Sequence, residues 1–89
     1  MAEGTVAAPA YVPQLASALQ AGLPGAQIQH EMVWHDCYRF IVVWDRFDNM
    51  DHPERQELVW DIADRALPKN ELRKVSMILT LGMDDLPEE

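Results

Sequence analysis

The chain has 89 residues, of which 48% are hydrophobic, and its 15 acidic and 7 basic side chains give a formal charge of −8. This length supports one domain rather than two, and the hydrophobic fraction supplies enough side chains for a packed core, which excludes a disordered chain. A single cysteine excludes an internal disulfide and a cysteine-based structural zinc site, and every apolar segment is far shorter than the roughly 18 residues that cross a bilayer. We therefore expect a soluble, cytoplasmic protein without membrane contacts.

The acidic excess is unevenly distributed along the chain. Residues 1–43 carry −2, residues 44–64 carry −5, residues 65–74 carry +3 and residues 75–89 carry −4. The net charge of −8 repels a phosphate backbone at long range, so a dedicated basic nucleic-acid binder is excluded. The local basic segment still permits weak, salt-sensitive nucleic-acid binding; the alternative is a solvated helix surface. The basic residues of this segment are Arg65, Lys69, Arg73 and Lys74.

Residues 1–11 are expected to form a flexible arm, because the opening residues are small and show no periodicity. Residues 12–89 are expected to form the single domain. A helix is predicted to begin near Pro13, which suits a first helical turn, and apolar residues follow it at helical spacing. Glycine and proline at 22–25 predict the end of this helix.

Two strands joined as a hairpin are predicted next. Residues 26–34 alternate between apolar and polar side chains, which indicates a half-buried strand with His30 on its buried face. Residues 35–37 break the alternation. Residues 38–44 are β-branched and aromatic and apolar on both faces, which predicts the central strand of a sheet.

A capped helix follows the hairpin. Asp51 and Glu54 have the spacing of a capping box, and Pro53 between them fits the first turn. Trp60 lies off the apolar face of this helix, which leaves it either exposed for a partner, with Leu67 nearby, or covered within the domain.

Pro68 is predicted to end this helix, and residues 70–75 are predicted to form a short third one before a last strand over 75–81. The order α-β-β-α-α-β gives an α/β (α+β) fold. The connection before the last strand is long enough for parallel pairing, so we expect a three-stranded mixed sheet packed against helices, with the class II KH-like topology.

The residues 37–47, Cys-Tyr-Arg-Phe-Ile-Val-Val-Trp-Asp-Arg-Phe, resemble the second strand of the BolA family. Residues 54–60 lie where that family has an Arg-His-Arg helix signature, with Arg55 kept and Gln56 in place of the histidine. Residues 86–89, Leu-Pro-Glu-Glu, resemble the family's closing Thr-Pro-Glu-Glu. The resemblance covers residues 12–89 and implies a regulatory or interaction module.

BolA-like proteins pair with monothiol glutaredoxins around a shared [2Fe–2S] cluster in iron homeostasis. The resemblance implies that Cys37, or His35 beside it, supplies the first ligand. Ser76 lies where the family has its second histidine, and a serine hydroxyl is a poor ligand for such a cluster. The chain alone is therefore expected to bind no cofactor, and the cluster to require the partner.

No set of acid, base and nucleophile with local support is present, so we expect a protein that is not an enzyme. Asp84 and Asp85 are expected to lie on a solvated tail. Arg55 and Trp60 are the candidate partner-binding residues, and a homodimer remains open. A KH-type nucleic-acid site would need a Gly-x-x-Gly turn, and residues 66–71 contain no glycine.

Overall fold

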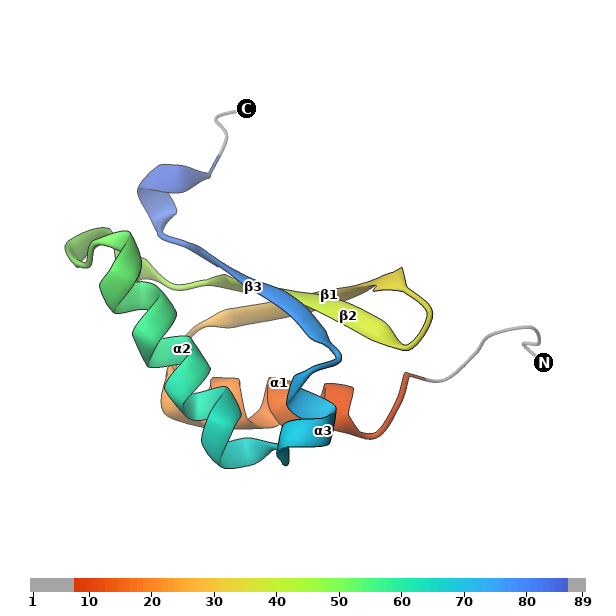
Figure 1. Cartoon of the computed structure of the whole chain (residues 1–89). Helices are drawn as coiled ribbons and strands as arrows, with labels where there is room; N and C mark the ends of the chain where they lie inside the picture. Colours follow the sequence, from red (N-terminus) through yellow and green to blue (C-terminus); the bar gives the residue numbers. More distant parts are fainter. Residues whose placement is uncertain (1–7, 87–89) are drawn as a thin grey trace.

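The computed structural model describes residues 8–86. Within these residues, three α-helices and three strands follow one another in the predicted α-β-β-α-α-β order, with two short 3-10 helices in addition (Figure 1). These elements are α1 (Tyr11–Gly22), β1 (Gln27–Trp34), β2 (Cys37–Val43), η1 (Asp45–Asn49), α2 (His52–Ala66), α3 (Lys69–Leu72), β3 (Val75–Leu81) and η2 (Met83–Asp85). The fold is therefore the mixed α/β domain that the sequence predicts.

The three strands form one sheet in the order β1-β2-β3, so β2 is the central strand, as predicted. β1 pairs with β2 in antiparallel fashion, from Gln27 opposite Val43 to Trp34 opposite Cys37. β3 pairs with β2 in parallel, which confirms the predicted mixed sheet. Both pairings contain one irregularity, between Met32 and Trp34 in β1 and beside Tyr38 in β2.

The hairpin turn consists of His35 and Asp36. Asp36 has a φ of 65°, in the left-handed region. Aspartate tolerates this region better than most residues, because its short side chain bonds to the nearby backbone. The turn chemistry is therefore supplied by an aspartate and not by a glycine.

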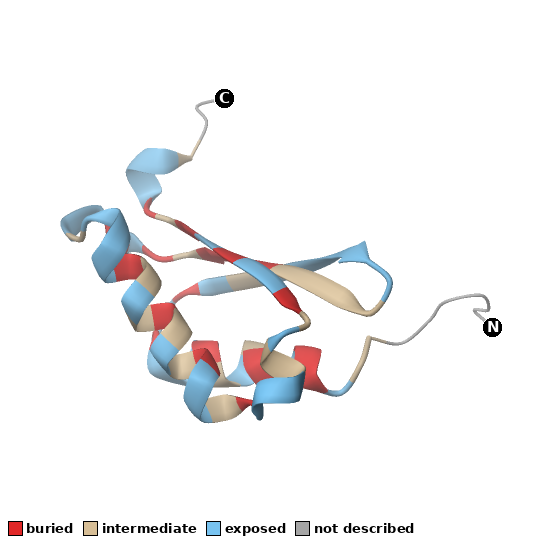
Figure 2. Ribbon diagram, viewed as in Figure 1, coloured by how far each residue is buried: buried red, intermediate tan, exposed pale blue. Residues whose placement is uncertain are grey.

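The core lies between the sheet and one layer of helices. Figure 2 shows the buried residues on the sides of α1 and α2 that face the strands. Tyr11 is 2% exposed and begins α1, which corrects the expected arm: it ends before Tyr11, and residues 1–7 lie outside the described part of the chain. The buried hydrophobic residues are Tyr11, Val12, Leu15, Leu19, Leu23, Ala26, Phe40, Val42, Trp44, Phe47, Val59, Ala63, Leu67, Val75 and Ile78.

The prediction that β1 is half buried is wrong. Of its eight residues, Ile28 is half buried against the core and the other seven are exposed. His30 is also exposed, with its ring 5.7 Å from that of Tyr38 and 6.0 Å from that of Phe40, measured between centroids. The reason is the position of β1 at the edge of the sheet, where the core reaches the strand at Ile28.

α2 begins with the predicted capping box. The Glu54 N–H donates to an Asp51 carboxylate oxygen at 3.0 Å, and the Asp51 N–H donates to the Glu54 carboxylate at 3.1 Å. α3 spans four residues and is shorter than the predicted 70–75. Within residues 8–86, none of the helices has the length and apolar character needed to cross a bilayer.

Candidate functional site

The most exposed large apolar side chains lie at the end of the β1–β2 hairpin. Trp34 is 74% exposed, Met32 62% and Val33 52%. We call residues 32–36 the hairpin tip. Three consecutive apolar side chains in contact with solvent are unfavourable in an isolated domain, and such clusters mark surfaces that another molecule covers. The sequence contained this signal, because the apolar Val33 breaks the alternation of β1.

The hairpin tip is fastened to the rest of the domain. The Tyr11 hydroxyl lies 3.0 Å from the Asp36 carbonyl oxygen and 3.1 Å from that of Lys74, and it shares its proton between the two. The Lys74 ammonium lies 3.1 Å from the Asp36 carboxylate. Burial raises the pKa of Tyr11 to about 12, and the negative forms of Cys37 and Asp36 add to this shift. The tip is therefore a preordered surface and not a loose loop.

The predicted ligands Cys37 and His35 both lie at this end of the sheet. His35 is exposed in the turn, and Cys37 is half buried at the start of β2, opposite Trp34. Ser76 is the second residue of β3, and its hydroxyl donates to the Tyr38 carbonyl at 3.3 Å. Within the described part of the chain, no three His, Cys, Asp or Glu side chains converge to hold a metal ion. Cys37 and His35 can therefore offer ligands to a cluster only if a partner supplies the others.

Arg55, predicted as a partner-binding residue, is buried and structural. Its Nε donates to the Met50 carbonyl at 3.0 Å, and its Nη1 donates to the Thr80 carbonyl at 3.3 Å. Nη1 also lies 2.9 Å from an Asp85 carboxylate oxygen. A buried guanidinium with these bonds offers little surface to a partner, so Arg55 is first of all a residue that holds the fold together.

Asp85 is exposed to solvent, as predicted, and in addition it is the counter-ion of Arg55. Its carboxylate also accepts the Gly82 N–H at 2.8 Å. The hydrogen bond from Gly82, which has the larger effect, and the hydrogen bond from Arg55 lower the pKa of the Asp85 carboxyl. A salt bridge between residues 30 apart in sequence leaves no local pattern, which is why the sequence did not indicate it.

Trp60 is half buried against the core, and its indole N–H donates to the Gln56 side-chain oxygen at 3.1 Å. Leu67 is 4% exposed. Of the two alternatives for Trp60, the one in which the domain itself covers the side chain therefore describes most of the residue. The Gln56 side chain is used within the fold, because it also donates to the Ile78 carbonyl at 2.9 Å.

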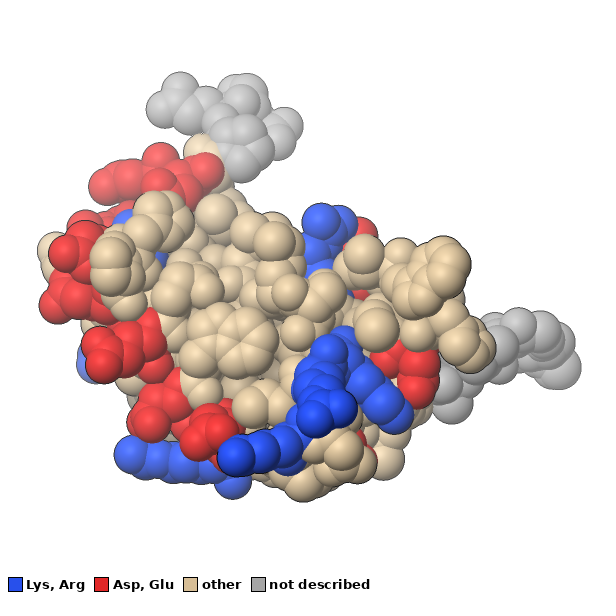
Figure 3. Space-filling model, viewed as in Figure 1, with Lys and Arg blue, Asp and Glu red and all other residues tan. Residues whose placement is uncertain are grey.

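The basic segment is partly neutralised within the chain. Arg65 lies 3.0 Å from Asp61, and Lys74 is paired with Asp36. Lys69 and Arg73 line a shallow depression that they share with Asp64 and Leu72. Figure 3 shows acidic side chains gathered over α2 and η2, and basic side chains over α3 between them and the hairpin.

A second surface is the face of the sheet on which none of the helices of the described part of the chain lies. Strand register places Ile41 beside Leu79, and Val43 beside Leu81, on this face. Leu79 is 37% exposed, and the neighbouring Met77 is 42% exposed. This face is apolar in its middle and ends toward the hairpin in the ion pair between Arg39 and Glu31, 2.6 Å apart.

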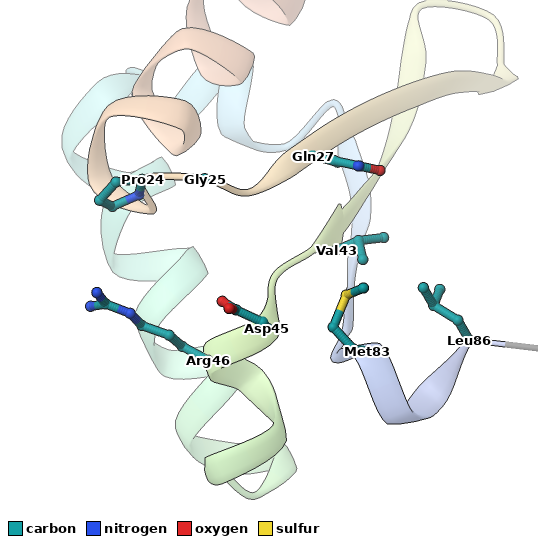
Figure 4. A pocket seen from close by; sticks show the side chains of 8 residues that line it. All are labelled: Pro24, Gly25, Gln27, Val43, Asp45, Arg46, Met83 and Leu86. Carbon is teal, nitrogen blue, oxygen red and sulfur yellow. The ribbon is translucent and has the colours of Figure 1, made fainter.

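An open groove of about 400 Å³ lies at the other end of the sheet. Figure 4 shows Asp45 and Arg46 of η1 on one side of this groove and Val43, Met83 and Leu86 on another. The Arg46 guanidinium lies 5.5 Å from the ring of Trp44. The lining residues are Pro24, Gly25, Gln27, Val43, Asp45, Arg46, Met83 and Leu86, which include one carboxylate and one guanidinium and no cysteine, serine or histidine.

Comparison with known proteins gave no match to a family model, to a curated protein or to a solved structure.

Proposed function

We propose that this chain is a protein-interaction module that binds its partner through the hairpin tip. The observation that carries the proposal is the exposed run of Met32, Val33 and Trp34 on a turn that Tyr11 and Lys74 hold in place. Burial of a tryptophan side chain supplies more binding free energy than that of most residues, and a preordered turn lowers the entropic cost of binding.

We propose a monothiol glutaredoxin as the partner, which rests on the resemblance of residues 12–89 to the BolA family. In such a complex Cys37, with His35 beside it, would contribute the ligands of this chain to a shared [2Fe–2S] cluster, and the partner would contribute the others. Thiolate and imidazole are suitable ligands for iron in such clusters. Bound there, the cluster would supply redox chemistry that the chain alone lacks.

The test is reconstitution of the full chain with a monothiol glutaredoxin under iron and sulfide, followed by size exclusion and visible absorption. We expect one peak that contains both proteins and absorbs in the visible range. Trp34→Ala should weaken the complex by about tenfold or more, as for a central aromatic contact. The matched control is Met83→Ala, which truncates another exposed apolar side chain, 54% exposed, at the other end of β3. Equal binding by the two variants would exclude the hairpin tip as the docking surface.

The ligand is tested separately from the surface. Cys37→Ala should abolish visible absorption while co-elution with glutaredoxin persists, and Ser76→Ala should change neither property. Ser76→His restores an imidazole where the resemblance implies the second ligand, and it should slow loss of the cluster to a chelator. If Cys37→Ala retains the full absorption, the thiolate is not a ligand, and His35 is then the candidate ligand of this chain.

A further inference from the structure

The two edge strands of the sheet differ in whether side chains bond to their outward-facing backbone groups. On β3, the Trp44 N–H donates to the Leu81 carbonyl at 2.9 Å, which shows that this carbonyl points toward β2. Alternation along a strand then directs the carbonyls of Ile78 and Thr80 to the outer edge. There Gln56 Nε2 donates to the Ile78 carbonyl at 2.9 Å, and Arg55 Nη1 donates to that of Thr80. Side chains of α2 therefore occupy the outer edge of β3.

In the part of the chain that the structure describes, the outer edge of β1 has no such cover. The Gln20 side chain donates to the Ala26 carbonyl, one residue before the strand. Within residues 8–86, no side chain bonds to the backbone of β1 itself. Proteins usually protect an edge strand with lysine, proline or an inward charge. β1 contains no lysine or proline, and its one charged residue, Glu31, is neutralised by Arg39 of β2.

We propose that the free edge of β1 pairs in antiparallel fashion with β1 of a second copy of this chain. A two-fold axis perpendicular to the sheet places equivalent side chains of the two copies on the same face of the joined sheet. Residues that lie opposite each other across the two β1 strands must therefore belong to the same face. The result is a continuous sheet in the order β3-β2-β1-β1-β2-β3, with the helices of both copies on the same side. This assembly does not depend on the partner proposed for the hairpin tip.

The sequence of β1 is self-complementary in one register. With His30 opposite His30 of the partner subunit, the half-buried Ile28 lies opposite the exposed Met32 of the partner subunit. Gln29 then lies opposite Glu31 of the partner subunit, where an amide donor meets a carboxylate. Each of these contacts occurs twice by symmetry, and cross-strand pairs of this kind stabilise a sheet.

The neighbouring symmetric registers are less favourable. A shift that places the axis at Glu31 brings two carboxylates together, which is destabilising for directly opposed strand residues. A shift that places it at Gln29 moves Met32 beyond the end of the partner strand, which begins at Gln27. The chain is acidic overall, but the net charge of β1 together with its paired Arg39 is zero with histidine neutral. Net charge therefore does not oppose the pairing of two copies at this edge.

The first test is sedimentation velocity of the full chain over roughly a hundredfold range of protein concentration. We expect a monomer–dimer equilibrium. His30→Lys places two ammonium groups at the axis and should raise the dimer dissociation constant by about tenfold or more. Ser76→Lys is the matched control, since it makes the same change in charge at an exposed position on the covered β3 side and should leave the dimer intact.

The second test is the register itself, in a Cys37→Ser background. His30→Cys places two cysteines directly opposite each other, where Cα atoms lie about 4.5–5.5 Å apart, within disulfide range. Gln29→Cys places the two cysteines two residues apart along the paired strands, with their Cα atoms more than about 7 Å apart. Mild oxidation should therefore link the His30→Cys chain at least about ten times faster than the Gln29→Cys chain. A chain that stays monomeric, a dimer unaffected by His30→Lys, or equal linking rates would each overturn the proposal.

Discussion

The hydroxyl of Tyr11 lies 3.0 Å from the carbonyl oxygen of Asp36, so the first turn of α1 is bonded to the turn of the β1–β2 hairpin. The Tyr11 ring also packs edge-on against that of Tyr38, with centroids 6.3 Å apart. The hairpin tip is therefore held in place by Tyr11, a residue of the core.

Tyr11 makes the stability of the domain sensitive to alkaline pH. The pKa of Tyr11 is raised from 10.0 to about 12 in the folded chain. Its contribution is complete below pH 10, and about 2 kcal/mol is lost as the pH rises through 12, because the unfolded chain releases this proton first. Denaturant unfolding between pH 9 and pH 12, followed by tryptophan fluorescence, should show this loss.

Tyr11→Phe is the control for that titration. At neutral pH it should lower the free energy of unfolding by about 1 kcal/mol, as for one lost hydrogen bond. Its unfolding free energy should then fall less steeply than that of the wild type above pH 10. Parallel curves for the two proteins would mean that Tyr11 does not carry the alkaline transition.

Arg55 is expected to be among the most costly residues to truncate. Arg55→Ala removes three hydrogen bonds and the packing of the guanidinium over Phe47, 5.8 Å from the ring centre. We expect a loss of about 2–4 kcal/mol in the free energy of unfolding, measured by urea titration. Arg65→Ala removes an arginine that is exposed and paired within α2, and should cost less than about 0.5 kcal/mol.

Asp85 should contribute to acid sensitivity. Because the pKa of its carboxyl is lowered, its contribution is present above the pKa of the unfolded chain, about 4, and is lost as the pH falls below that value. Asp85→Asn should therefore be less stable than the wild type at pH 7, and the difference should shrink toward pH 2. Thermal unfolding at several pH values measures it, and a difference that is constant with pH would contradict this assignment.

Gly82 is expected to tolerate no side chain. A Cβ at Gly82 would overlap the Asp48 carboxylate, which accepts the N–H groups of Met83 and Asp84, and would lie 3.0 Å from the Asp48 backbone nitrogen. Gly82→Ala should lower the free energy of unfolding by about 1–3 kcal/mol. Gly22→Ala is the control, because its Cβ would meet the mobile end of Ile62 and alanine favours the helix.

Much of the fold could be predicted because it depends on local chemistry. The capping box at Asp51 and the bounds of β3 follow from residues that act on their immediate neighbours. The central position of β2 follows from a strand that is apolar on both faces. The prediction that Tyr11 belongs to an arm fails, although Tyr11 and Leu15 have the i, i+4 spacing that joins them on one helix face.

The candidate site was less predictable because it depends on which elements meet. Alternation in β1 indicated a buried face, but an edge strand that extends past its helices has little to bury against. Arg55 is two residues from the exposed His52–Pro53 turn in sequence, and its burial depends on Asp85 and Thr80 far along the chain. Long-range partners of this kind leave no signal in one sequence.

The bonds from Arg55 and Gln56 to β3 also define where α2 lies along the sheet. Two adjacent helix residues contact carbonyls two residues apart on the strand, about 6.6 Å. Sliding α2 by one turn, about 5.4 Å, would separate both donors from their carbonyls at once. The two bonds therefore fix the position of α2 along β3. A core substitution that loosens the packing of Val59 or Ala63 should lower the packing density of the domain and leave α2 in the same position along the sheet.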